Sequence, residues 1–140
     1  MDAVGKRTSG KGDGVRKFLM VVLLVGGCAA KPPLTTGDGT YAVQWSTVDE
    51  APIDANKWCD IRIQIETLKG SGDDLSIRFD ATMPAHRHGM NVVVTPRNVG
   101  PNEWVVEDVL MHMPGEWALD FDITDSNGVV HRAREIVVIE

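Results

Sequence analysis

Three of the four histidines lie in two short segments, residues 83–90 and 111–117, which also hold four of the six methionines. Imidazole nitrogen is a good ligand for Cu(II), Zn(II) and Ni(II), whereas the soft thioether sulfur of methionine favours Cu(I). A mixed set of this kind therefore predicts a copper ion as cofactor. The candidate ligands are Met83, His86, His88, Met90, Met111, His112 and Met113.

The first segment has the spacing of a binding loop. His86 and His88 are two residues apart, so in an extended chain they project to the same side. Pro84 and Gly89 interrupt regular strand pairing, which predicts a loop or the entrance to a strand. Binding residues are commonly carried on loops between rigid strands.

The second segment has an alternative interpretation. Met111 and Met113 share one face of a strand and His112 takes the other, so the three converge only if the strand ends there, as Pro114 suggests. Otherwise the methionines are core packing and the histidine hydrogen-bonds a backbone carbonyl. If the strand does end, we expect both segments to meet in one patch at the end of the fold.

Other functions find less support in the sequence. No hydroxyl nucleophile lies beside a histidine in a known motif, and glycine-rich phosphate loops, GxSxG and CxxC are absent from the sequence. We therefore predict no catalytic residues and no enzyme activity. The formal net charge of −6 argues against nucleic acid as a partner, which would require a basic face. Cys59 is expected to be a small, buried apolar residue; the alternatives are a thiol ligand or an intermolecular disulfide.

Residues 1–27 have the layout of an export signal. A basic start is followed by an apolar run from Phe18 to Val25, which is too short for the roughly 20 residues that span a bilayer. Gly26 and Gly27 then precede Cys28, as in a bacterial lipobox, where the signal is cut before a cysteine that receives lipid. The alternative is an ordinary signal peptide with a chance cysteine. Lipidated Cys28 predicts a membrane-anchored protein of the cell envelope that faces the periplasm or the cell surface.

The mature chain divides into a tether and a domain. Residues 28–40 are rich in Pro, Gly and Thr and predict a flexible linker. Residues 41–140 show apolar residues at every second position, which is typical of strands with one buried face. Turn signals separate them, including Asn127-Gly128. About seven strands at this spacing predict an all-β, immunoglobulin-like antiparallel β-sandwich.

Two strands carry specific expectations. One contains four large apolar residues that alternate with two carboxylates. We expect Asp120 and Asp122 to lie on a solvated outer face, and the apolar set to point inward: Trp117, Leu119, Phe121 and Ile123. The apolar run at residues 90–95 predicts a second strand.

The two His/Met segments and their spacing resemble the YtkA-like/FixH-like domain family. Its members often show an MPxHxHGM stretch followed by an FHMxGxW stretch, and the match covers about residues 60–140. The resemblance implies an exported or membrane-attached immunoglobulin-like sandwich with a role in copper handling or oxidase assembly. Two positions depart from the pattern: Arg87 lies between the candidate ligands, and Leu110-Met111 replaces an aromatic residue. Arg87 would disfavour a bound cation if it pointed inward.

Two functions follow from these observations. The first is a lipid-anchored copper carrier or buffer that passes metal to a membrane or periplasmic protein partner. The second is a protein-interaction module of the cell envelope that binds no metal, in which both segments are structural.

Overall fold

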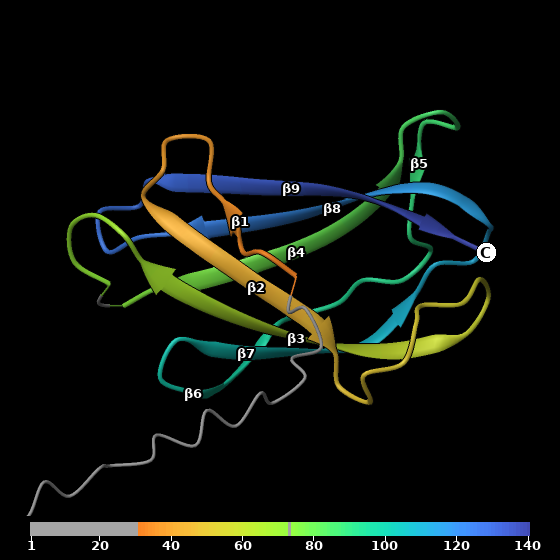
Figure 1. Ribbon diagram of the computed structural model, residues 1–140, viewed down its shortest axis with the longest axis horizontal. Helices are drawn as coiled ribbons and strands as arrows, with labels where there is room; N and C mark the ends of the chain where they lie inside the picture. Colours follow the sequence, from red (N-terminus) through yellow and green to blue (C-terminus); the bar gives the residue numbers. More distant parts are fainter. Residues whose placement is uncertain (1–30, 73) are drawn as a thin grey trace, which may run out of the picture. The chain divides into compact units, whose positions relative to one another are not determined.

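The computed structural model describes residues 31–72 and 74–140, and this part of the chain contains strands and no helix. Figure 1 shows the strands in chain order. They are β1 (Leu34–Thr35), β2 (Tyr41–Thr47), β3 (Trp58–Thr67), β4 (Ser76–Met83), β5 (His88–Gly89), β6 (Arg97–Gly100), β7 (Glu103–Leu110), β8 (Gly115–Thr124) and β9 (Val130–Ile139).

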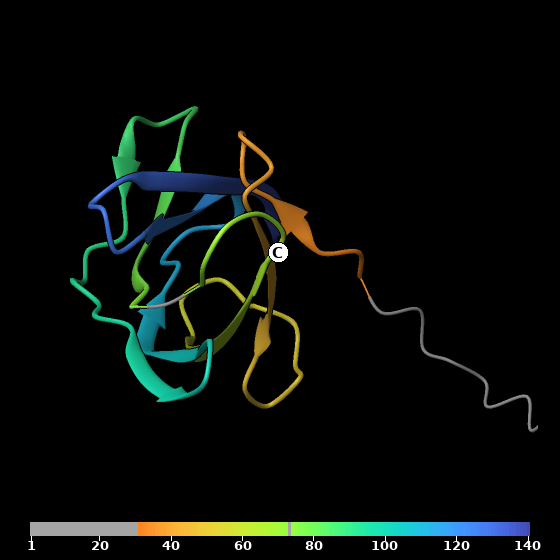
Figure 2. The same ribbon diagram turned by 90° about the vertical axis from the view of Figure 1, so that its left-hand side faces the viewer.

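The strands form two antiparallel sheets. The first has the order β1-β2-β3-β7-β6 and the second the order β5-β4-β8-β9. Figure 2 looks along the strands from the end where β8 turns into β9. One hydrophobic core draws side chains from both sheets, so the fold is a β-sandwich, as the alternating pattern predicted.

Strand β8 lies in the middle of the second sheet and supplies much of the core. Trp117, Leu119, Phe121 and Ile123 all have no exposed surface, which confirms the predicted inward face. Across the core they meet residues of the first sheet such as Ile61 and Val106. A slip of one residue would exchange this face for the one that carries the carboxylates, so the pattern determines the register.

The outer face of β8 is not solvated, and this prediction was wrong. Asp120 and Asp122 point away from the core but are only 7% exposed. Arg134, opposite Asp120 on β9, donates to both of its oxygens at 2.7 Å. Arg132 makes the same forked contact with Asp122 at 2.6 and 2.8 Å. The arginines cover the carboxylates, and each forked pair satisfies both oxygens of its acid.

The apolar run at 90–95 is not a strand, which corrects the second expectation. The N–H of Met90 still donates to the carbonyl of Ala81 at 3.1 Å, but residues 90–95 belong to no strand and cross from β5 in one sheet to β6 in the other, with Val93 fully exposed. Buried and exposed residues do not alternate regularly along β7, which follows β6 in the chain. Val106 and Val109 are both buried because a bulge opposite Asp60 adds one residue, and Asp108 there takes a positive φ of 59°.

The folded unit begins at Lys31, so the predicted tether is wrong for residues 31–40. Leu34 and Thr35 pair with β2, and Thr36 is 3% exposed. Lys31 forms an ion pair with Glu135, and its Nζ lies 4.5 Å from the centroid of the Trp45 ring. These contacts tie the segment to both sheets and give it a fixed place that composition alone could not indicate.

Residues 1–30 lie outside the described part of the chain, and with them the predicted signal and the lipidation at Cys28. Within residues 31–72 and 74–140, no helix could cross a membrane.

Candidate metal-binding site

The two His/Met segments meet at one end of the sandwich. The ring centroids of His88, on β5, and His112, in the β7–β8 loop, are 5.2 Å apart. The ring of His86 lies 5.8 Å from that of His88. Figure 1 shows β5 at the end where β4 stops and β8 starts. The predicted juxtaposition of the two segments is therefore confirmed, and Pro114 follows a strand that ends at Leu110, as the convergence required.

A tight turn between β4 and β5 positions the first two histidines. The backbone N–H groups of His86 and Arg87 both donate to the carbonyl of Met83, at 3.1 and 2.9 Å. Arg87 completes the turn with a positive φ of 57°. Met83 then pairs with His88 across the ladder, which places these two side chains on the same face of the sheet. His86 and Arg87 are exposed, whereas His88 is half-buried.

Trp117 holds the second segment in place. Its indole N–H donates to the carbonyl of Met113 at 2.9 Å, which fixes the loop that carries His112. The indole also lies edge-on to both imidazoles, 5.6 Å from His112 and 6.1 Å from His88. The sequence placed Trp117 in the core but gave no indication of this second contact.

Gly115 lets the end of Met83 approach the same loop. Its φ is +129°, and a Cβ there would lie 2.9 Å from the terminal methyl of Met83. A side chain at this position would therefore push the end of the Met83 side chain aside. The proximity of glycine and methionine follows from the fold and has no signal in the sequence.

One buried imidazole nitrogen in the patch has no hydrogen-bond partner among the described residues. Nδ1 of His112 is buried and makes no hydrogen bond within the described residues. Buried polar atoms are normally paired, so an unpaired one needs an explanation such as a bound ion or water. Nδ1 of His88, by comparison, is 3.3 Å from the carbonyl of Gly89.

The methionines divide between core and surface. Met83 and Met111 are buried, and Met90 packs against the core from a half-buried position. Met113 is 36% exposed and is the accessible thioether of the second segment. The described residues contain no group of three or more His, Cys, Asp or Glu side chains arranged to hold a metal ion. A metal ion at this patch would therefore need a thioether ligand or a rotation of the rings.

Cys59 is not part of the patch. Its side chain is half-buried rather than fully buried. Burial, followed by the charges of Asp60 and Asp49, raises the pKa of its thiol to about 11. The thiol therefore stays protonated near neutral pH and is a poor metal ligand there.

No family model, curated protein or solved structure matches the chain. The resemblance to the YtkA-like/FixH-like family thus stays a prediction from the two motifs, as do the immunoglobulin-like details of the sandwich.

Proposed function

We propose that the patch formed by His86, His88, His112 and Met113 binds a copper ion, and that the protein carries or buffers it in the cell envelope. The observation that carries this proposal is the approach of His88 and His112 to 5.2 Å together with the unpaired, buried Nδ1 of His112. Copper fits this donor set because imidazole suits Cu(II) and thioether suits Cu(I). The two motifs that resemble the YtkA-like/FixH-like family support the same function.

The residues around the patch have separate roles. His88 from β5 and His112 from the β7–β8 loop would supply nitrogen, and the indole of Trp117 lies against both rings. Exposed His86 and Met113 would complete the set from the surface, where a partner protein has access. Protons compete with metal for imidazole nitrogen, so affinity should fall below about pH 6.

A competitive titration of the full chain with Cu(I), Cu(II) and Zn(II) against a chromogenic chelator tests the site. We expect a His88→Ala/His112→Ala double variant to lose at least about tenfold in copper affinity, in the range that changes near a metal produce. His131→Gln is the matched control, because this fourth histidine lies on β9, outside the patch. Equal affinity of the double variant and the unchanged protein would refute the copper site and favour the interaction module.

We further propose that lipid on Cys28 anchors the protein to a membrane, on the evidence of the Gly26-Gly27-Cys28 sequence alone. Mass spectrometry of the native N-terminus should find a lipid adduct on Cys28, and Cys28→Ser should leave the precursor uncut. A native protein cleaved elsewhere and unmodified would contradict the anchor.

A further inference from the structure

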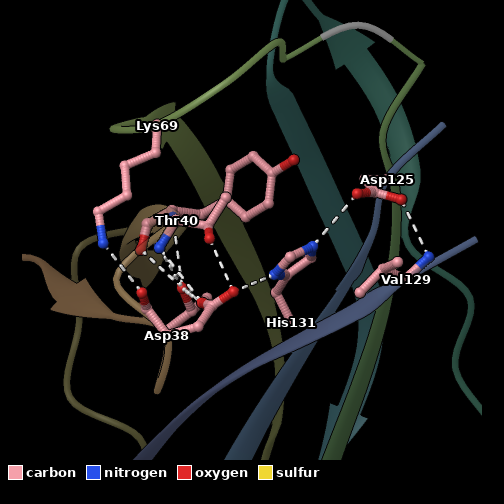
Figure 3. Close-up of polar contacts among 8 residues, drawn as sticks. Asp38, Thr40, Lys69, Asp125, Val129 and His131 are labelled. Carbon is pink, nitrogen blue, oxygen red and sulfur yellow. Dashed lines mark hydrogen bonds and ion pairs between the residues drawn. The ribbon is translucent and has the colours of Figure 1, made fainter. Parts of the chain in front are cut away.

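His131 lies between two carboxylates at the end of the sandwich away from the His/Met patch. Its Nδ1 is 2.6 Å from Oδ2 of Asp38, and its Nε2 is 3.4 Å from Oδ2 of Asp125 (Figure 3). Asp38 belongs to the β1–β2 loop, whereas Asp125 begins the turn between β8 and β9. The imidazole, whose side chain is only 9% exposed, therefore joins the two sheets of the fold.

Neighbouring donors hold Asp38 in place. Its Oδ1 accepts from the Thr36 hydroxyl at 2.7 Å, and its Oδ2 accepts from the Thr40 hydroxyl at 2.7 Å. Lys69, from the β3–β4 loop, donates to the backbone carbonyl of Asp38 at 3.1 Å. The bond from Thr40, followed by those from Thr36 and from the His131 ring, holds the pKa of the Asp38 carboxyl well below its usual range. Asp38 is therefore a fixed anion facing the imidazole.

Asp125 is fixed in the same manner on the other side of the ring. Its Oδ1 accepts from the backbone N–H groups of Asn127 and Val129, both at 2.9 Å, which leaves Oδ2 directed at His131 (Figure 3). The Val129 bond is the main reason why the pKa of Asp125 is lowered. A further titratable group beside the ring is Tyr41 on β2, whose ring lies edge-on to the imidazole at 5.0 Å.

Only the charged imidazole satisfies both carboxylates. Imidazolium donates from both nitrogens, whereas the neutral ring donates from one and turns a lone pair toward the other carboxylate. Burial alone would lower the pKa of His131, but the hydrogen bonds and charges of Asp38 and Asp125 outweigh it, and the pKa is raised. A raised pKa means that the bridge stabilises the fold below the ordinary histidine pKa and is lost as pH rises through the raised value.

We propose that Asp38, His131 and Asp125 form a pH-operated clasp that holds the β1–β2 loop, residues 36–40, against β9 and releases it when His131 loses its proton. The bond from the N–H of Gly37 to the carbonyl of Arg132, at 3.1 Å, lies beside the clasp and should open with it. Residues 31–35 are held separately, by the pairing of β1 with β2 and by the Lys31–Glu135 ion pair. Loss of the clasp would therefore loosen the loop and leave the core of the sandwich intact.

Amide hydrogen exchange of the full chain, with the His131 ring followed by NMR, tests the clasp between about pH 5 and about pH 9. After correction for the intrinsic rate, the amides of residues 36–41 should lose protection with the same midpoint as the ring titration, above 6.5. Each unit by which the midpoint exceeds that value corresponds to about a tenfold change in the opening equilibrium. Core amides of β8 should not change.

Three variants distinguish loss of the clasp from a general loss of protein stability. His131→Gln should show low protection of residues 36–41 at every pH, and Asp125→Asn should move the midpoint down toward 6.5. Asp54→Asn is the control, since this exposed carboxylate pairs only with Lys57 in the contacts described. A ring midpoint at or below 6.5, or protection that is constant across the midpoint in the unchanged protein, would overturn the proposal even if a variant fails to fold.

Discussion

The ion pair of Asp122 and Arg132 lies on the outer face of β8. Loss of Arg132 should lower the free energy of unfolding more than loss of Asp122, and the two effects should not be additive. Asp122 is nearly buried, with its side chain 10% exposed, whereas the side chain of Arg132 is 53% exposed. Without Asp122, Arg132 can turn into water. Without Arg132, Asp122 keeps a weaker ion pair with Arg78 at 3.7 Å and the more distant charge of Arg134. We therefore expect Arg132→Ala to destabilise the protein more than Asp122→Ala.

The magnitudes follow from this geometry. A carboxylate that loses its partner in a fully buried pair costs about 3–5 kcal/mol. Because solvent reaches Arg132, we expect a smaller loss of about 2–3 kcal/mol for Arg132→Ala and about 1–2 kcal/mol for Asp122→Ala. The two bonds of 2.6 and 2.8 Å should give a coupling energy of about 1–2 kcal/mol.

Urea unfolding of the two single variants and the double variant measures these terms. The Arg132 bonds are the largest reason why the pKa of Asp122 is lowered. The stabilisation should therefore be complete above about pH 4, the usual carboxyl range, and disappear as pH falls through the lowered pKa. A coupling below about 0.5 kcal/mol, typical of exposed pairs, or a greater loss for Asp122→Ala would refute the reasoning.

Three further changes test the core, the patch and the thiol. Phe121→Ala removes a fully buried ring and should cost about 3–5 kcal/mol in a denaturant titration; a loss below about 1 kcal/mol would mean that the core is misassigned. Gly115→Ala, at the end of the loop that carries His112, should cost about 1–3 kcal/mol, because the new methyl meets the end of Met83 and φ is positive; calorimetry showing unchanged stability would contradict this. Cys59 should react with iodoacetamide near neutral pH about a hundredfold more slowly than a free thiol, as judged by peptide mapping, and rapid alkylation there would contradict the raised pKa.

The sequence predicted the strands whose pattern is regular. In β8 every second residue is large and apolar, and that face is buried as expected. The pattern could not show that the opposite face is covered, because the arginines come from β9 and their position depends on its register. In β7 the bulge at Asp108 removes the alternation itself, so no period-two signal was present to detect.

The candidate site was partly predictable for a similar reason. Residue types and the strand-ending Pro114 indicated that the two segments meet, and the rings of His88 and His112 do lie together. Met83 and Met111 are buried because their side chains point into the core. The spacing of the two motifs did not indicate in which direction these side chains would point. The indole of Trp117 lies against both His88 and His112, which come from β5 and from the β7–β8 loop. This contact depends on how the two sheets pack, so the spacing of the motifs could not predict it.

Strand β9 lies at the edge of its sheet, and its free side is only partly occupied. The N–H of Gly37 binds the carbonyl of Arg132 near one end, and the N–H of Ala55 binds the carbonyl of Glu140 at the other. Between them Ile136 and Val138 are 51% and 68% exposed. An edge strand with unpaired backbone groups can pair with another copy of the protein. The N-terminal segment, residues 31–40, covers part of this edge, so detachment of that segment would expose more unpaired backbone on β9. Self-association should then increase with protein concentration.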